Sequence, residues 1–222
     1  MINLIIFGSG DLFLEILSYL KDIEKNSKEK FNICLVVSNH VSVISKKQAK
    51  KIWGKKIKFS KKLLKLNQGL KYKAIIAIAD ADKREKIRKN LHLQLELYTL
   101  IHPLASVSDH SKIGKGTIIA PHVIISPFAK IGCNVFINAK SIIGHHAALS
   151  ISCSISTACV ISGHVKIGKT SNIGSSSFLL NHIKVAQRSS IVSSSSLFNS
   201  FKKKNIVIAG NPARIVVKNF LK

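Results

Sequence analysis

The second half of the chain repeats aliphatic residues at every sixth position. From Ile101 to Leu197 this register contains 17 positions, and each holds isoleucine, leucine or valine. Four positions after each of the first sixteen, from Ala105 to Ser195, alanine, serine, threonine, valine or cysteine occurs with the single exception of Ile183. Neither an alternating strand nor an amphipathic helix has a period of six. The pattern predicts a parallel β-helix with three short strands in each 18-residue coil, and between five and six coils in all.

Residues 18 positions apart should lie about 4.8 Å apart, one coil above the other. This rule predicts one column made of His110, Phe128, His146, His164 and His182. Accidental clustering, a polar edge that faces a cofactor, or a metal site would each account for it. Zinc needs ligands that converge on one point, and a straight column converges poorly unless a neighbouring subunit contributes. We therefore assign no metal ligand from the sequence.

The first hundred residues have the pattern of a small α/β domain. An apolar run from Asn3 to Phe7 precedes Gly8-Ser9-Gly10, and a helical apolar spacing follows from Leu12 to Ile23. Residues 33–37 and 74–79 predict further strands, and residues 83–91 predict a basic helix. We expect a Rossmann-like domain at 1–100 and the β-helix with a tail at 101–222. The glycine turn fits either a phosphate site or a plain tight turn.

Composition and charge narrow the classes of ligand. Hydrophobic residues make up 46% of the 222 residues, which excludes a disordered chain, and the net charge of +25 favours an acidic ligand. Twelve lysines between Lys46 and Lys73 fit a solvated face better than an RNA site, since no RNP motif accompanies them. Four cysteines without a CxxC pair favour a reducing cytoplasm. Acidic residues interrupt the apolar amino terminus, so we expect a strand and helix there and neither a signal nor an anchor.

Seven segments, in this order, resemble one family of enzymes. They are IADADKR (Ile78 to Arg84), IHPLA (Ile101 to Ala105), KIGKGTII (Lys112 to Ile119), FIN (Phe136 to Asn138), IIGHH (Ile142 to His146), GHVKIG (Gly163 to Gly168) and GNPAR (Gly210 to Arg214). The family is that of the sialic-acid O-acetyltransferases and the nucleotide-sugar acetyltransferases of the bacillosamine or perosamine type. The resemblance implies a Rossmann-like domain joined to a left-handed β-helix, acetyl-CoA as acetyl donor, and a cytoplasmic homotrimer in cell-surface polysaccharide biosynthesis.

The resemblance also implies roles for single residues. His145 falls at the position of the general base, and His146 stands where the family has a carboxylate. Asn138 and Gly163 match positions near the acetyl group, whereas Ser154 replaces a second family histidine. Gly8, Ser9, Gly10 and Asp80 are implied as substrate-binding residues, although the family's Gly-Gly-His turn has become Gly10-Asp11-Leu12. Basic residues of the last coils and the tail are candidates for the CoA phosphates: Lys184, Arg188, Lys202, Lys203, Lys204 and Arg214.

The spacing of the only carboxylate after residue 100 limits the mechanism. Asp109 lies two coils from His145, or about 9.6 Å, which excludes a Ser-His-Asp triad within the β-helix. We expect an acetyltransferase that modifies an amino or hydroxyl group of a nucleotide-linked sugar, with His145 as the base. Two alternatives remain: a scaffold protein that lost turnover together with the carboxylate, and a metal-dependent hexapeptide enzyme.

Overall fold

The computed structural model describes residues 1–64, 66–67, 69–91 and 95–217, and the chain divides into two compact units. The first contains Met1–Ala79 and Lys86–Tyr98, and the second contains Asp80–Glu85 and the chain from Thr99 onward. Compactness does not show independent folding, so the domain division at residues 100 and 101 stays a prediction. No helix in the described ranges is long and apolar enough to cross a membrane.

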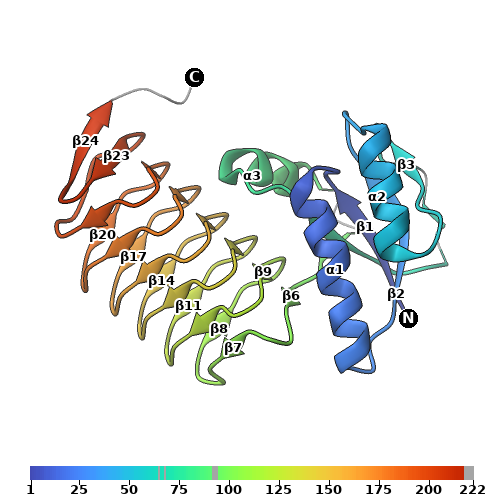
Figure 1. Ribbon diagram of the computed structural model, residues 1–222, viewed down its shortest axis with the longest axis horizontal. Coiled ribbons are helices and arrows are strands. Elements are labelled where there is room, and N and C mark those ends of the chain that lie inside the picture. Colours follow the sequence, from blue (N-terminus) through green and yellow to red (C-terminus); the bar gives the residue numbers. More distant parts are fainter. Residues whose placement is uncertain (65, 68, 92–94, 218–222) are drawn as a thin grey trace. The chain divides into compact units, whose positions relative to one another are not determined.

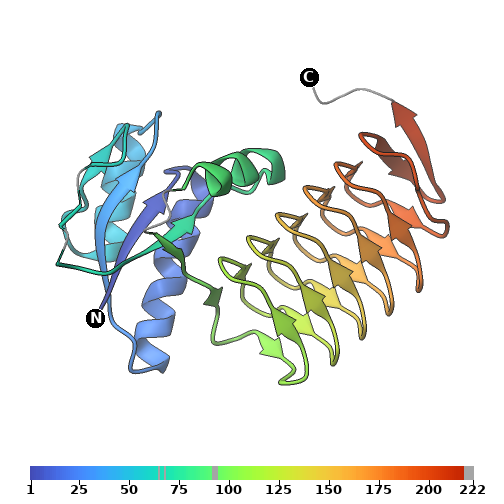
Figure 2. The same cartoon turned by 180° about the vertical axis from the view of Figure 1, so that it is seen from behind.

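The first unit is a parallel five-stranded sheet in the order β3-β2-β1-β4-β5, an order that also opens the Rossmann fold. Helices α1 and α2 cover one face of this sheet (Figures 1 and 2). The elements are β1 (Ile2–Phe7), α1 (Asp11–Asn26), β2 (Phe31–Val37), α2 (Val43–Trp53), β3 (Phe59–Ser60), β4 (Tyr72–Ile76), α3 (Ala81–Asn90), which continues into this unit from the second, and β5 (Glu96–Leu97). The predicted Rossmann-like fold of this part is confirmed.

Helix α2 was not predicted, because only two of its residues, Ala49 and Trp53, are buried and the apolar periodicity is weak. The features that define this helix are instead the residues at its two ends. The Ser42 side chain accepts a hydrogen bond from the Ser45 N–H at 2.9 Å, and Gly54 ends the helix with φ 76°. The lysines of this helix therefore lie on its solvent side, as the solvated basic face requires.

The second unit is a left-handed parallel β-helix of stacked triangular coils, as predicted (Figure 1). Its three sheets contain β7, β10, β13, β16, β19 and β22; β8, β11, β14, β17 and β20; and β6, β9, β12, β15, β18, β21, β23 and β24. The first sheet comprises Ser106–Val107, Ile124–Ile125, Ile142–Ile143, Val160–Ile161, Phe178–Leu179 and Ser196–Leu197. The second comprises Lys112–Ile113, Lys130–Ile131, Ala148–Leu149, Lys166–Ile167 and Lys184–Val185. The third comprises Leu100–Ile101, Ile118–Ile119, Phe136–Ile137, Ser154–Ile155, Asn172–Ile173, Ser190–Ile191, Val207–Gly210 and Ala213–Val217.

The register of the sheets matches the 18-residue spacing. Ile124 pairs with Ile142, and Lys166 pairs with Lys184. The aliphatic residues of the six-residue register are at most 4% exposed from Ile119 to Leu197, while Ile101 in the first coil is 38% exposed. The aliphatic series is therefore the interior of the β-helix, and its exposed members belong to the end of the stack. At the other end, GNPAR forms the turn between β23 and β24.

The corners of the coils hold non-glycine residues in the left-handed conformation. Thirteen such residues occur at six-residue intervals from His122 to Ser194, among them His146 and His164 with φ of 58° and 60°. A backbone hydrogen bond ties neighbouring coils at the corner, since the His164 N–H donates to the His145 carbonyl oxygen at 3.0 Å. The repeat thus fixes the backbone beneath each corner side chain.

Two outer faces of the β-helix differ in chemistry. The outward residues of β10, β13, β16 and β19 are Ile124, Ile142, Val160 and Phe178, which we call the apolar face. The outward residues of β8, β11, β17 and β20 are all lysine, namely Lys112, Lys130, Lys166 and Lys184, which we call the lysine face. Like charges on paired strands oppose each other, so the lysine face is suited to an anion and the apolar face to another apolar surface.

Arg84 fastens residues Asp80–Glu85 to one corner of the β-helix, which explains the IADADKR motif. Its guanidinium donates to the carbonyl oxygens of Asn134 (2.9 Å), Ser152 (3.0 Å) and Cys153 (2.7 Å), and to Ser154 Oγ at 2.8 Å. The side chain is fully buried. Desolvation lowers the pKa of Arg84 to about 10, so the group stays charged at neutral pH.

Candidate functional site

His145 and His146 form a hydrogen-bonded pair at a corner between β13 and β14. Their Nδ1 atoms are 3.2 Å apart, and the two rings are nearly perpendicular at 85°. Which nitrogen carries the shared proton depends on the tautomers. Both side chains are exposed, so the pair is open to ligands. The structure therefore brings the two predicted catalytic residues together, with His146 in direct contact with the nitrogen that a carboxylate would otherwise orient.

Gly163 supports the His145 ring from below. A Cβ atom added at Gly163 would lie 2.7 Å from both Cε1 and Nε2 of His145. Any side chain at position 163 would therefore displace the imidazole. Gly163 was predicted to contact the cofactor. That role stays a prediction, whereas its contact with His145 is a positioning role that the sequence analysis did not anticipate.

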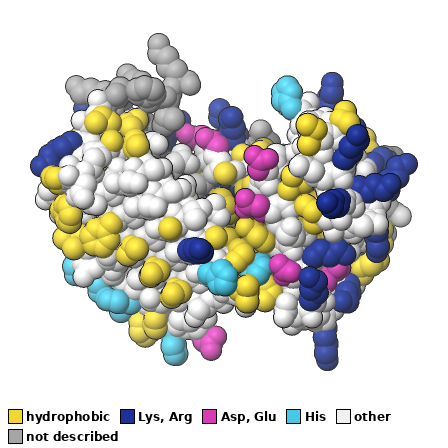
Figure 3. Space-filling view, in the orientation of Figure 1, with side chains coloured by type: hydrophobic (Ala, Val, Ile, Leu, Met, Phe, Trp, Pro, Cys, Tyr) yellow, Lys and Arg dark blue, Asp and Glu magenta, His cyan; other side chains and the backbone are white. Residues whose placement is uncertain are grey.

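The predicted column of rings is present. Figure 3 shows histidine side chains along the lower edge of the β-helical unit. The His146 and His164 rings stack with centroids 4.7 Å apart, and those of His164 and His182 lie 4.6 Å apart; Phe128 continues the column at 5.0 Å from His146. Desolvation, followed by repulsion from the neighbouring imidazoles and Lys166, lowers the pKa of His164. The middle ring of the column is thus held in its neutral form more readily than a free histidine.

No carboxylate contacts His145 within the part of the chain that the structure describes. The hydrogen bond to His146 is the one recorded for its side chain there, and its other contacts are the rings of His146 and His164. The base candidate is therefore oriented by a neutral or cationic group and not by an anion.

A cleft of about 400 Å³ lies on the lysine face of the β-helix. Lys166, Lys184 and Lys202 line it together with the Phe201 ring and small residues of β14, β17 and β20. Its remaining lining residues are Ala148, Ser150, Ile167, Gly168, Val185 and Ala186. Three ammonium groups around an apolar floor suit a phosphorylated ligand with an apolar portion. We call this the lysine cleft; it contains the predicted Lys184.

The other predicted CoA ligands have partners of their own. Arg188 lies 3.6 Å from the Asp82 carboxylate, which offsets part of its charge. The Arg214 guanidinium donates to the carbonyl oxygen of Ala213. The Asn138 side chain accepts a hydrogen bond from the Ala139 N–H at 2.7 Å. The roles of these three residues as cofactor ligands stay predictions.

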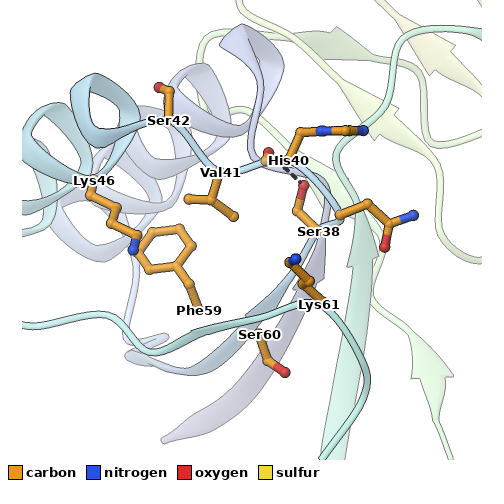
Figure 4. A pocket seen from close by; sticks show the side chains of 9 residues that line it. Ser38, His40, Val41, Ser42, Lys46, Phe59, Ser60 and Lys61 are labelled. Atoms are coloured by element: carbon orange, nitrogen blue, oxygen red, sulfur yellow. Dashed lines mark hydrogen bonds between the residues drawn. The ribbon is translucent and has the colours of Figure 1, made fainter.

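A second cleft opens in the first unit where β2 and β3 end (Figure 4). Its volume is about 550 Å³, and it is lined by Ser38, Asn39, His40, Val41, Ser42, Lys46, Phe59, Ser60 and Lys61. The Lys46 ammonium lies 5.8 Å from the centre of the Phe59 ring. Ligands of parallel α/β sheets bind at the carboxyl ends of the strands. We call this the amino-terminal cleft.

The predicted substrate-binding glycines do not line this cleft. Gly8, with φ 109°, allows close approach to Ala77, whose carbonyl oxygen would lie 2.6 Å from an added Cβ. Gly10 is the N-cap of α1. Ser9 does contact the cleft loop, because its hydroxyl donates to the His40 carbonyl oxygen at 2.7 Å and lies 2.9 Å from Ser38 Oγ. Asp80 belongs to the second unit, where its carboxylate accepts from the Lys83 N–H at 2.8 Å and caps α3.

The residues that line the amino-terminal cleft were not predicted from the sequence. A signal was present, since Ser38, Asn39 and His40 directly follow the apolar strand β2 at its carboxyl end. Lys46 and Lys61 lay within the lysine-rich stretch that we interpreted as a solvated face, and nothing in their spacing singles them out.

Comparison with solved structures shows the same fold over nearly the whole chain. PerB from Caulobacter crescentus, in complex with CoA and GDP-perosamine, has a TM-score of 0.80 at 20% identity, with 97% of each chain covered. WeeI from Acinetobacter baumannii has a TM-score of 0.76 at 17% identity, covering 97% of this chain and 100% of that one. The acetyltransferase domain of PglB from Neisseria gonorrhoeae, in complex with acetyl coenzyme A, gives 0.68 at 19% identity, covering 96% and 98%.

These similarities confirm, at the level of the fold, the resemblance to nucleotide-sugar acetyltransferases. No protein-family model matches the chain, and no curated protein sequence matches it.

Proposed function

We propose that the protein is an acetyl-CoA-dependent acetyltransferase that modifies an amino or hydroxyl group of a nucleotide-linked sugar. The observation that carries this proposal is the His145–His146 pair, held over Gly163 on a β-helix whose fold matches that of PerB. The same fold in complexes with CoA, acetyl-CoA and GDP-perosamine supports the classes of donor and acceptor.

His145 acts as the general base through Nε2. That nitrogen accepts the proton that the acceptor's amino or hydroxyl group releases as it attacks the thioester carbonyl, and His145 then returns a proton to the departing CoA sulfur. To accept at Nε2, neutral His145 must carry its own proton on Nδ1 and donate it to His146 Nδ1, 3.2 Å away. His146 must then carry its proton on Nε2. His146 is thus a positioning residue that accepts this hydrogen bond and stabilises the base-competent tautomer of His145.

Two clefts fit the two substrates. The three ammonium groups of the lysine cleft, from Lys166, Lys184 and Lys202, suit the phosphates of CoA. The amino-terminal cleft offers Lys46 and Lys61 for the diphosphate of a nucleotide sugar and the Phe59 ring for its base. Ser9 then serves to hold the loop beside this cleft, while Gly8 and Gly10 shape the turn between β1 and α1.

We further propose a cytoplasmic homotrimer. The apolar face carries Ile124 and Ile142 at 45% and 39% exposure, so self-association would bury it. The lysine face repels a second copy of itself and stays open to substrate.

The replacement His145→Ala tests the proposal. We expect turnover of GDP-, UDP-, dTDP- or CMP-linked amino sugars to fall by about 10² to 10⁴, because a general base acts in the transition state. The thermal shift produced by acetyl-CoA should stay nearly unchanged. His182→Ala, in the same column but outside the pair, is the matched control and should retain its rate.

Retained turnover in His145→Ala would overturn the assignment of the base. Binding of acetyl-CoA without turnover of any acceptor by the unmodified chain would favour the scaffold alternative.

A further inference from the structure

The proposed base and two neighbouring imidazoles together have the spacing of a metal site. Ligand atoms of His145, His146 and His164 all lie within 4.8 Å of one another. We infer that these three histidines form a binding site for a single divalent ion that prefers imidazole ligands, and that Zn²⁺ is the ion that fits best. The proposed acetyl transfer itself uses no metal ion at this corner.

The distance between the two nearest nitrogens already suits zinc. Zinc bound at 2.0–2.1 Å by tetrahedral nitrogen ligands places those nitrogens about 3.3 Å apart. The Nδ1 atoms of His145 and His146 are 3.2 Å apart and aim at each other across a shared proton. A metal ion that takes the place of this proton lies off the line between the two nitrogens, so each ring must rotate outward by about 35° for its lone pair to point at the ion. The separation of these two nitrogens is therefore already suitable before the ion binds.

The third ligand has to move. The His164 ring lies parallel to that of His146 at 7°, and parallel rings cannot both direct a lone pair to one point. His164 must therefore tilt out of the stack, so that one of its nitrogens, within 4.8 Å of the other two ligand atoms, reaches the separation of about 3.3 Å that tetrahedral zinc requires. The side chain is only half-buried, and its backbone is fixed by the bond to the His145 carbonyl oxygen. The movement is thus a side-chain rotation, and the fourth position stays open to water.

The donor set selects the class of ion. Three neutral nitrogen ligands without a carboxylate favour Zn²⁺, Cu²⁺ or Ni²⁺ over Mg²⁺ and Ca²⁺, which require oxygen ligands. Cys153 and Cys159 are fully buried inside the coils and offer no competing thiolate at this corner. Lys166 acts against a cation, because its charge lies two residues from His164 on the same coil. Three nitrogen ligands attract the ion and the Lys166 charge repels it, so we expect the ion to bind reversibly and not permanently.

Occupation would have a consequence for acetyl transfer. A metal ion bound to Nδ1 of both His145 and His146 removes the hydrogen bond that stabilises the base-competent tautomer, and it withdraws electron density from the His145 ring. Zinc should therefore inhibit the enzyme reversibly. This consequence rests on the proposed function, whereas the binding itself does not.

Equilibrium dialysis with ZnCl₂ alone tests the site on the full chain, prepared without a histidine tag and kept reduced. We expect one saturable zinc ion per chain. His164→Asn and His146→Asn should each weaken its binding by about tenfold or more. His182→Asn is the matched control: its ring stacks on His164 at 4.6 Å but lies outside the cluster, so it should bind zinc as the unmodified chain does. Circular dichroism of each variant checks that the β-helix has formed.

Loss of the saturable site in His164→Asn with retention in His182→Asn supports the inference. The absence of a one-to-one site, or an unchanged affinity in His164→Asn, overturns it. Inhibition assays separate the two proposals, because zinc that binds at this corner without slowing acetyl transfer would contradict the role of His145 and leave the metal site standing.

Discussion

Arg84 is the most deeply buried charged side chain on which the second unit depends, and the replacement Arg84→Met tests its role in stability. Methionine is of similar length and fills much of the same space, so the change removes the hydrogen bonds with little loss of volume. Two carbonyl oxygens, those of Asn134 and Ser152, would lose their recorded partner. The Cys153 carbonyl oxygen would keep its bond from the Phe136 N–H at 2.9 Å.

The expected cost follows from these contacts. Each buried acceptor left without a partner costs about 1–3 kcal/mol, so two carbonyls give about 2–6 kcal/mol. Methionine also avoids the free-energy cost of burying the guanidinium charge, and this gain offsets part of the loss. We therefore expect the free energy of unfolding to fall by about 2–4 kcal/mol, the lower half of that range. For a chain of this size each kcal/mol shifts Tm by about 2–4 °C, hence a fall of roughly 5–15 °C. Arg84→Lys should give an intermediate loss, since lysine keeps the charge but not the fork of donors.

Urea denaturation and calorimetry measure the effect. Lys83→Met makes a comparable change at an exposed position of the same helix and should stay within about 0.5 kcal/mol of the unmodified chain. A loss below about 1 kcal/mol in Arg84→Met would show that water satisfies the freed carbonyls, and it would refute the view that this arginine fastens residues 80–85 to the β-helix.

Two further predictions concern the site and the assembly. His146→Asp should raise the maximal rate of acetyl transfer and move the acidic limb of the pH–rate profile upward, and pH-dependent steady-state kinetics would measure both. Light scattering of the unmodified chain should give three times the 24.4 kDa chain mass. The double variant Ile124→Glu and Phe178→Glu places charges on the apolar face and should give the mass of a single chain. Lys130→Glu on the lysine face is the control and should stay trimeric. A monomeric mass for the unmodified chain at micromolar concentration would contradict the proposed trimer.

The β-helix could be predicted because its physics is local and repeated. Each coil needs an aliphatic residue at the same place, so the six-residue register from Ile119 to Leu197 records the interior directly. Stacking then converts sequence distance into spatial distance, and the column from His146 to His182 follows from a spacing of 18. The glycine turn at Gly8 and the strands β1, β2 and β4 followed from conventional apolar runs, whereas the two-residue strands β3 and β5 were too short to give such a run.

The contacts of single side chains could not be predicted in the same way. The Nδ1–Nδ1 contact of His145 and His146 depends on rotamers, and nothing in IIGHH distinguishes rings that meet from rings that diverge. The burial of Arg84 depends on where residues 80–85 pack, which no periodicity encodes. The amino-terminal cleft is formed by loops after two strands, and loops lack a hydrophobic pattern.

The size of the effect of His146→Asp distinguishes two roles for the missing carboxylate. In the present pair the proton lies on Nδ1 of either His145 or His146, and without further bias about half of the neutral pairs hold the base-competent arrangement. An aspartate would select that arrangement in every molecule, a gain of about twofold. It would also stabilise the imidazolium formed in the transition state, although water around this exposed pair limits that gain to about fivefold. Aspartate tolerates the left-handed backbone at this corner, where φ is 58°. We therefore expect the rate to rise by between about twofold and tenfold. A gain of only about twofold, with an unchanged acidic limb of the pH–rate profile, would assign the carboxylate an orienting role alone. A variant slower than the unmodified chain would show that this site requires the second imidazole and not an acid.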